Sequence, residues 1–203
     1  MITIGLTGSI GMGKTTADGY FREAGVPVHD SDAAVHGLYR GRAAPLIEAA
    51  FPGCTENGIV NRAFLGARVL EDRSALKKLE AIIHPLVSEA RRDFIRSAQK
   101  ARYRCAVLDI PLLLETGVHR SVDIIAVVSA PAHIQRARVL QRPGMTSERF
   151  SAISAQQLPD AEKRRLAHVL IDSGGNRSFL RRQVRDLIRA AMGQAAKGIF
   201  ADA

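Results

Sequence analysis

Residues 2–16 read ITIGLTGSIGMGKTT, an apolar, β-rich run followed by a glycine-rich turn. The phosphate-binding pattern of glycine, four residues and then Gly-Lys-Ser/Thr is met here by Gly8, Gly13, Lys14 and Thr15. The glycines let successive backbone N–H groups point inward at phosphate oxygens. Lys14 can reach the outer phosphates, and the Thr15 hydroxyl can ligate magnesium. The stretch therefore predicts a P-loop that binds a nucleoside triphosphate.

The residues after the turn support this interpretation. Residues 14–25 read KTTADGYFREAG, which is typical of a helix capped by Gly25. The N-terminus of such a helix carries partial positive charge and unpaired N–H donors, which attract the same anion. The alternative is a glycine-rich turn that holds no ligand.

Five short apolar runs predict the strands of one sheet. They lack strict alternation, as expected for parallel strands that helices cover on both faces. The runs are 2–6, 26–30, 105–110, 122–128 and 168–172. The pattern predicts a doubly wound α/β fold with ligands at the carboxyl ends of the strands.

Two long gaps separate these runs. The first predicts helices at 43–50, 62–71, 74–82 and 85–101, with a turn-rich stretch at 51–58, and this helical insertion suits a second substrate. The second gap, 131–167, predicts a helix at 133–141, a turn at 142–144 and further helix, with many arginines. Residues 178–192 predict an amphipathic helix whose apolar stripe contains Phe179, Leu180, Val184, Leu187, Ile188 and Ala191.

Composition restricts the partners and the compartment. Against 20 Asp and Glu stand 29 Lys and Arg, and the net charge of +9 suits nucleotides, phosphorylated metabolites or nucleic acid. Aromatic residues make up only 5%, so base stacking is weakly provided and no nucleic-acid partner is expected. Cys54 and Cys105 are interpreted as reduced thiols. No apolar run approaches about 20 residues, and no room for a signal peptide precedes the first strand, so we expect a cytoplasmic protein with no membrane partner.

Acidic residues follow two of the predicted strands. In an extended chain Asp30 and Asp32 point the same way, and there they can hold an acceptor hydroxyl or contribute to magnesium binding. The alternative is a turn whose aspartates cap the next helix, since Ser31 and Asp32 are good N-cap residues. Asp109 ends another strand, where a carboxylate can support magnesium or cap the following loop.

Arginines of the second gap can stabilise a transferring phosphate. Helical spacing puts Arg138 and Arg142 on one face, and arginine forks match phosphate oxygens. For any single arginine, a solvated helix face is the simpler alternative. His84 precedes Pro85 at the predicted start of a long helix, and by itself it says little.

Taken in order, these motifs resemble the dephospho-CoA kinase family over nearly the full length. The family's loop resembles residues 7–16, its D-x-D with a following His resembles Asp30, Asp32 and His36, and its R-x-x-L and His-Pro resemble Arg62, Leu65, His84 and Pro85. Its P-L-L-x-E resembles Pro111, Leu112, Leu113 and Glu115. Its lid pattern resembles Gln135, Arg138 and Arg142, followed by Gln156, Lys163 and residues 171–174.

The resemblance implies a P-loop NTPase-type three-layer α/β fold with a five-stranded parallel sheet, a helical insertion and a lid. The nucleotide core would comprise about 1–36, 105–130 and 168–203, the CoA-substrate insertion about 37–104, and the lid about 131–167. The implied activity is phosphorylation of the ribose 3′-hydroxyl of dephospho-CoA by ATP, the last step of coenzyme A synthesis, with Mg2+.

The resemblance also implies roles for single residues. ATP would be bound by Gly8, Gly11, Met12, Gly13, Lys14, Thr15, Thr16 and Arg142. The acceptor would be bound by Asp30, Asp32, His36, His84 and Leu113. Asp32, Lys14 and Arg138 would be catalytic, and Thr15 and Asp109 would ligate the metal. The chain departs from the family pattern at Met12, Val35, Ala152 and Ser173, where a small residue, a small residue, an arginine and an asparagine are usual.

Two other functions remain open on the sequence. A nucleoside or nucleotide monophosphate kinase would share the core and lid, although the long insertion and the His-Pro favour the CoA acceptor. A P-loop regulatory or nucleic-acid-binding protein is the other alternative, and the guanine-reading N-K-x-D of a switch GTPase is absent from the sequence. The oligomeric state is not predicted.

Overall fold

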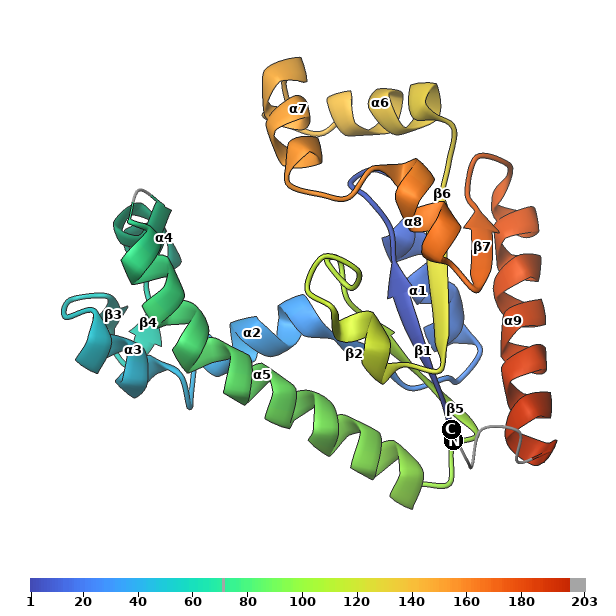
Figure 1. The fold of residues 1–203 in the computed structure, drawn as a ribbon, viewed down its shortest axis with the longest axis horizontal. Helices are drawn as coiled ribbons and strands as arrows, with labels where there is room; N and C mark the ends of the chain where they lie inside the picture. The colour runs from blue at the N-terminus through green and yellow to red at the C-terminus, as the bar shows by residue number, and fades with distance from the viewer. Residues whose placement is uncertain (71, 198–203) are drawn as a thin grey trace. The chain divides into compact units, whose positions relative to one another are not determined.

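The computed structural model describes residues 1–70 and 72–197, in which five strands form one parallel sheet in the order β2-β5-β1-β6-β7 (Figure 1). The strands are β1 (Ile2–Thr7), β2 (Val28–Asp30), β5 (Cys105–Asp109), β6 (Ile124–Ser129) and β7 (Val169–Asp172). Each lies within a few residues of its predicted position. The predicted α/β class and five-stranded parallel sheet are confirmed.

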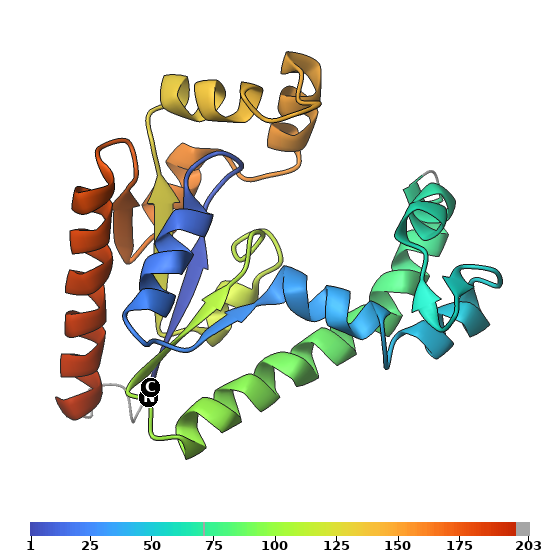
Figure 2. The same cartoon turned by 180° about the vertical axis from the view of Figure 1, so that it is seen from behind.

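Helices cover both faces of this sheet. Helix α1 (Lys14–Glu23) packs against α9 (Arg177–Lys197), and α8 (Asp160–Leu166) packs against β6. Figures 1 and 2 show α1 and α8 on opposite faces of the sheet, which gives the predicted three layers. The connection from β6 to α8 contains α6 (Ala132–Leu140) and α7 (Ser147–Ala155), and a short 3-10 helix spans Val118–Ser121.

The apolar core lies between the sheet and α1 with α9. Strand residues such as Ile4, Leu6 and Val128 pack there with Phe21 of α1. The predicted stripe of α9 is buried in this core at Leu180, Val184, Leu187, Ile188 and Ala191. Phe179 is the exception, because it remains 36% exposed at the first turn of the helix.

The chain divides into two compact units, and the second is Asp30–Ser97. This unit is mostly helical: α2 (Ser31–Tyr39), α3 (Ala44–Ala50), α4 (Arg62–Leu70) and the larger part of α5 (Arg73–Lys100). It has a separate apolar core that includes Leu38, Ile47, Phe51 and Leu65. The predicted turn-rich stretch also contains a small antiparallel pair, β3 (Thr55–Glu56) with β4 (Ile59–Val60).

The prediction of two helices, 74–82 and 85–101, is wrong because α5 continues through Pro85. A proline inside a helix removes one backbone hydrogen bond and crowds the preceding turn. Packing outweighs that cost, since Leu79 and Ile83 lie on the core side of α5 just before the proline. The N-terminus of the helix is also stabilised by a side chain, because the Asp72 carboxylate accepts hydrogen bonds from the N–H groups of residues 74 and 75.

Both cysteines are buried and free of disulfide bonds, in agreement with the predicted thiols. Burial raises the pKa of the Cys54 thiol and of the Cys105 thiol, which keeps both in the unreactive neutral form. None of the helices in the described part of the chain has the length and apolar character of a membrane span.

Candidate active site

The P-loop connects the end of β1 to the first residue of α1. Gly13 is the N-cap of α1 and has φ 85°, in the left-handed region that glycine adopts without steric cost. Gly11 has φ 79°, and a Cβ atom there would lie 2.4 Å from Val139 Cγ2 of α6. A larger residue at either position would displace the loop, which is the local reason for the glycine pattern.

The backbone N–H groups of the loop that find no acceptor in the described part of the chain include those of Gly11, Gly13, Lys14 and Thr15. The buried Ser9 hydroxyl also lacks a partner there. Buried backbone donors in folded proteins are nearly always paired, and the unpaired N–H groups of a helix N-terminus favour an anion. We call these four N–H groups the anion cradle.

Met12 is not part of the anion cradle. Its N–H donates to the Ser9 carbonyl, 3.1 Å away, and closes a turn inside the loop. Its side chain is 2% exposed, and its Sδ atom lies 3.1 Å from the Ala130 nitrogen. The implied contact of Met12 with ATP is therefore not one that its N–H can make in this loop conformation, because that N–H already donates to Ser9.

The charged residue of the loop has a strand-end partner. Lys14 Nζ lies 2.6 and 2.7 Å from the two carboxylate oxygens of Asp109, the last residue of β5. The side chains of this pair are 18% and 7% exposed. The enclosed ion pair holds the ammonium group beside the P-loop. Gly8 is buried directly after β1, and Thr16 is exposed in the first turn of α1.

Oxygen atoms suited to magnesium are available at this end of the sheet. Thr15 offers an exposed hydroxyl at the start of α1, and Asp109 offers a carboxylate at the end of β5. Among the described residues no three His, Cys, Asp or Glu side chains form a metal site by themselves. Magnesium commonly takes one or two protein oxygens together with substrate phosphates and water, and the residues present fit that arrangement.

The two predicted lid arginines differ in their surroundings. Arg138 of α6 donates to the Ser173 hydroxyl at 3.1 Å and to the Ser173 carbonyl at 2.7 Å. Ser173 in turn donates from its hydroxyl to the Met12 carbonyl at 2.6 Å, so Arg138 is connected to the P-loop. Arg142 is exposed and lies two residues beyond the end of α6, so the two arginines do not share a regular helical face.

The segment after β5 forms structural contacts. Leu113 is fully buried, and its side chain lies against Gly5 of β1, so we do not retain it as a substrate contact. Glu115 Oε1 lies 2.8 Å from Nζ of Lys163, a lysine of α8 with no exposed surface. The same oxygen accepts a hydrogen bond from the Leu158 N–H at 2.9 Å. Burial would raise the pKa of Glu115, but the Lys163 ammonium and the Leu158 amide outweigh it and lower that pKa.

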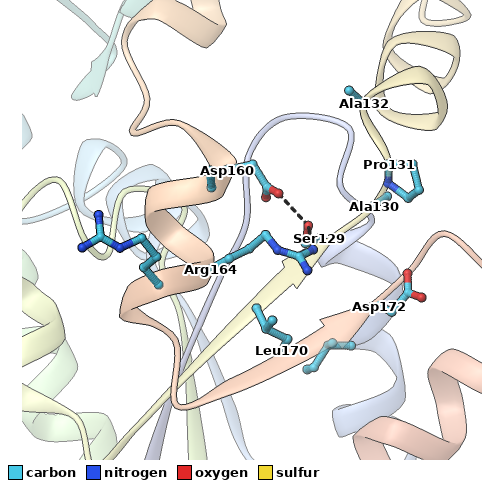
Figure 3. Close-up of a pocket in the computed structure, with 11 residues that line it drawn as sticks. Ser129, Ala130, Pro131, Ala132, Asp160, Arg164, Leu170 and Asp172 are labelled. Carbon is cyan, nitrogen blue, oxygen red and sulfur yellow. Dashed lines mark hydrogen bonds between the residues drawn. The ribbon is translucent and has the colours of Figure 1, made fainter.

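A cavity of about 710 Å³ lies between α8 and the ends of β6 and β7 (Figure 3). In its wall, the Ser129 hydroxyl donates to Asp160 at 2.8 Å and accepts from Arg164 at 3.2 Å. Arg165 and Asp172 also line it. The cavity lies at the carboxyl edge of the sheet, where ligands are expected in this fold. In the sequence, the only indication of this cavity is the high density of arginines in residues 131–167.

The Asp30–Ser97 unit holds the remaining predicted residues. Asp30 is the N-cap of α2, and its carboxylate accepts a hydrogen bond from the Ala33 N–H at 2.9 Å. Asp32 is exposed in the first turn of α2. The inference that the two side chains share the direction of an extended chain is wrong, because the strand ends at Asp30 and the helix begins at Ser31. The predicted alternative, a segment that caps the next helix, is confirmed, but the cap is Asp30, whereas the expected capping residues Ser31 and Asp32 lie inside α2.

The two predicted histidines are both exposed. His36 of α2 lies 2.8 Å through Nε2 from a guanidinium nitrogen of Arg62. Because arginine can only donate, Nε2 accepts, which requires the neutral ring with its proton on Nδ1. His84 lies on the surface of α5 and does not begin that helix.

Comparisons with known proteins agree on one family. A family model described as dephospho-CoA kinase matches residues 2–178. A protein of Brucella melitensis named dephospho-CoA kinase is 57% identical over 196 residues, which cover 97% of this chain and 98% of that protein.

Solved structures give the same result for the fold. A crystal structure from Thermus thermophilus has a TM-score of 0.80 and 32% identity, and covers 93% of this chain and 97% of that chain. A dephospho-CoA kinase structure from Campylobacter jejuni has a TM-score of 0.67 at 20% identity, covering 93% and 96%, and supports the fold alone.

Proposed function

We propose, because the chain belongs to the dephospho-CoA kinase family, that it transfers the γ-phosphate of ATP to the ribose 3′-hydroxyl of dephospho-CoA. The products would be coenzyme A and ADP. The observation that carries the donor half of this proposal is the anion cradle at the N-terminus of α1, with the Lys14 ammonium beside it. Preorganised N–H donors of this kind stabilise transferring phosphate.

Lys14 changes partner in the proposed reaction. In the structure its ammonium pairs with Asp109, which keeps it near the cradle. When ATP binds, the outer phosphates attract the ammonium away from this carboxylate. Thr15 and Asp109 would then hold a magnesium ion, which when bound would neutralise part of the phosphate charge.

Asp32 is the proposed base for the acceptor. Its carboxylate is exposed in the first turn of α2, where a ribose hydroxyl can reach it. The 3′-oxygen bonds to the γ-phosphorus, the bond from that phosphorus to the bridging oxygen of ADP breaks, and Asp32 takes the hydroxyl proton. We assign Asp30, His36 and His84 to binding of the acceptor, within the unit Asp30–Ser97.

Arg138 and Arg142 are proposed to act on the transferring phosphate. A guanidinium fork matches phosphate oxygens and stabilises the charge that shifts between them. Arg138 lies on α6 and bonds to Ser173 in the structure, so it would exchange this partner for phosphate. Arg142 is already exposed.

An acceptor panel tests the proposal. ADP release would be measured by a coupled assay with ATP and magnesium, using dephospho-CoA, adenosine, AMP, CMP or pantothenate as the acceptor. We expect turnover with dephospho-CoA and the formation of coenzyme A, identified by mass spectrometry. Turnover selective for AMP or CMP would instead assign a nucleotide kinase activity. Omission of magnesium should abolish the reaction.

A further inference from the structure

The P-loop residue Ile10 is held on both sides by glutamine side chains. Its N–H donates to Gln157 Oε1 at 3.0 Å, and its carbonyl accepts from Gln135 Nε2 at 2.8 Å. Gln135 lies on α6, and Gln157 lies in the link between α7 and α8 (Figure 1). Residues on either side of the segment 136–156 thus contact the same P-loop residue.

The polarity of these two hydrogen bonds is fixed by chemistry. A backbone N–H can only donate, so Gln157 must present its oxygen to Ile10. A backbone carbonyl can only accept, so Gln135 must present its NH2 group. The two glutamines are therefore not interchangeable, although both are half-buried amides directed at one residue.

Peptide planarity extends this hold into the anion cradle. The Ile10 carbonyl and the Gly11 N–H belong to one planar peptide group, so fixing the carbonyl also fixes the direction of the N–H. The Gly11 N–H is one of the four cradle donors. Likewise the Ile10 N–H shares a plane with the Ser9 carbonyl, which accepts from the Met12 N–H.

A second carbonyl behind the cradle is held in the same way. The Ser173 hydroxyl donates to the Met12 carbonyl, which shares its peptide plane with the Gly13 N–H. The two loop donors that precede the helix, at Gly11 and Gly13, are thus each oriented by a side chain bonded to the carbonyl of the same peptide. This repetition argues that the contacts of Ile10 orient donors and do more than pack a loop.

We propose that Gln135 and Gln157 are positioning residues that hold the two peptide planes at Ile10, and so preorganise the P-loop for phosphate. Neither glutamine touches phosphate in this role. The inference rests on the proposed binding of ATP by the cradle. It assigns the glutamines on α6 and before α8 to nucleotide affinity, through the loop that they hold.

Substitution by glutamate tests the proposal. It places the same charge at both positions, but it preserves the hydrogen bond at one position and removes it at the other. In Gln157→Glu the introduced carboxylate still accepts from the Ile10 N–H. In Gln135→Glu it cannot donate and faces the Ile10 carbonyl, which leaves that carbonyl unpaired. The probe is ADP with magnesium, and its Kd is measured by calorimetry at pH 8. We expect Gln135→Glu to bind about tenfold more weakly than Gln157→Glu.

The pH dependence separates this role from a general loss of structure. A carboxylate facing a carbonyl is protonated more easily, and its neutral form can donate an O–H to Ile10. The difference between the two glutamate variants should therefore shrink when the titration is repeated at pH 5.5. Gln141→Glu, an exposed substitution at the end of α6, should match wild type at both pH values.

Equal ADP affinities of the two glutamate variants, or a difference unchanged at pH 5.5, would overturn the proposal. If Gln135→Glu does not fold by circular dichroism, Gln135→Met replaces it and should bind ADP more weakly than Gln157→Glu. Wild-type protein that bound no ADP would contradict the proposed function itself, whereas wild-type binding with equal variants contradicts only the role of the glutamines.

Discussion

The P-loop region and the Asp30–Ser97 unit differ in whether their polar side chains are paired inside the protein or exposed on its surface. Around the P-loop, Lys14 forms an enclosed ion pair with Asp109. Arg138 donates a hydrogen bond to the backbone carbonyl of Ser173. In the Asp30–Ser97 unit, Asp32, His36 and His84 lie on the surface. The first region presents fixed N–H donors, and the second presents exposed side chains.

Under the proposed function, the difference separates a preorganised donor half of the reaction from an acceptor half that is not preorganised. The donor half uses backbone groups whose directions are set by glycine conformations and buried partners, so its geometry exists before ligand binds. In the proposed reaction the acceptor half relies on exposed side chains, which would lose conformational freedom when the acceptor binds. Breaking a partner in the first region should therefore affect the loop or the fold, and breaking a residue in the second should affect turnover.

The largest effect is expected at the only charged side chain of the P-loop. Lys14→Ala removes the cation that we assign to the outer phosphates, and should lower kcat/KM for ATP by about 10³-fold. Circular dichroism should show that the variant still folds, although the loss of the Asp109 partner should lower its free energy of unfolding. Lys100→Ala, at the exposed end of α5, is the matched loss of one lysine and should have no effect. Near-normal turnover of Lys14→Ala would contradict the assignment of the loop.

The second effect is on stability and concerns the buried pair of Lys163 and Glu115. Lys163→Met leaves a largely buried carboxylate without its cation and should lower the free energy of unfolding by about 3 kcal/mol. Urea denaturation at pH 7 measures this. A loss below about 0.5 kcal/mol would mean that Lys163 contributes no more than a surface lysine.

The same pair predicts a pH dependence. Because folding lowers the pKa of Glu115, the unfolded state binds a proton more readily than the folded state. The carboxylate thus stabilises the protein above its unfolded pKa of about 4.3, and this contribution is lost as the pH falls through the folded pKa. The difference in unfolding free energy between wild type and Glu115→Gln should therefore be present at pH 7 and vanish in acid.

The sequence predicted the P-loop region well because the features that define it are short stretches of chain. A glycine pattern, a following helix and a strand-end carboxylate are short-range features, and the structure has all three in place. The partners that complete the region are far along the chain, however. Glu115 with Lys163 and Gln157 with Ile10 arise only when α8 and its preceding link pack at the sheet. No local pattern marks such pairs.

The Asp30–Ser97 unit was predicted less well because tertiary packing overrode local rules. Pro85 predicted a helix start, yet the apolar side of α5 keeps the helix continuous. The short hairpin of β3 and β4 was read as turns only, since two-residue strands have no periodicity to detect. The extended reading of Asp30 and Asp32 failed because α2 begins between them.

A third effect tests the Asp30–Ser97 unit through Asp32, its proposed base. Asp32→Asn should lower kcat by about 10²-fold, because the amide cannot take the acceptor proton. The Kd for ADP should stay within about threefold of wild type, since Asp32 is assigned to the acceptor and makes no proposed hydrogen bond to ADP. Asp93→Asn removes an exposed carboxylate of α5 and is the control. Equal losses in kcat and in ADP affinity would instead indicate a metal-binding or folding role.

The smallest effect separates the two roles of Asp30. Its carboxylate caps α2, so Asp30→Ala should lower the free energy of unfolding by about 1 kcal/mol, whereas Asp30→Ser keeps a capping oxygen and most of that stability. If Asp30 also binds the acceptor, both variants should lose about tenfold in kcat/KM for dephospho-CoA. Normal kcat/KM in Asp30→Ser would leave Asp30 with the cap alone. Asp30 would then resemble the polar residues around the P-loop, because its hydrogen-bond partner, the Ala33 N–H, belongs to the protein itself.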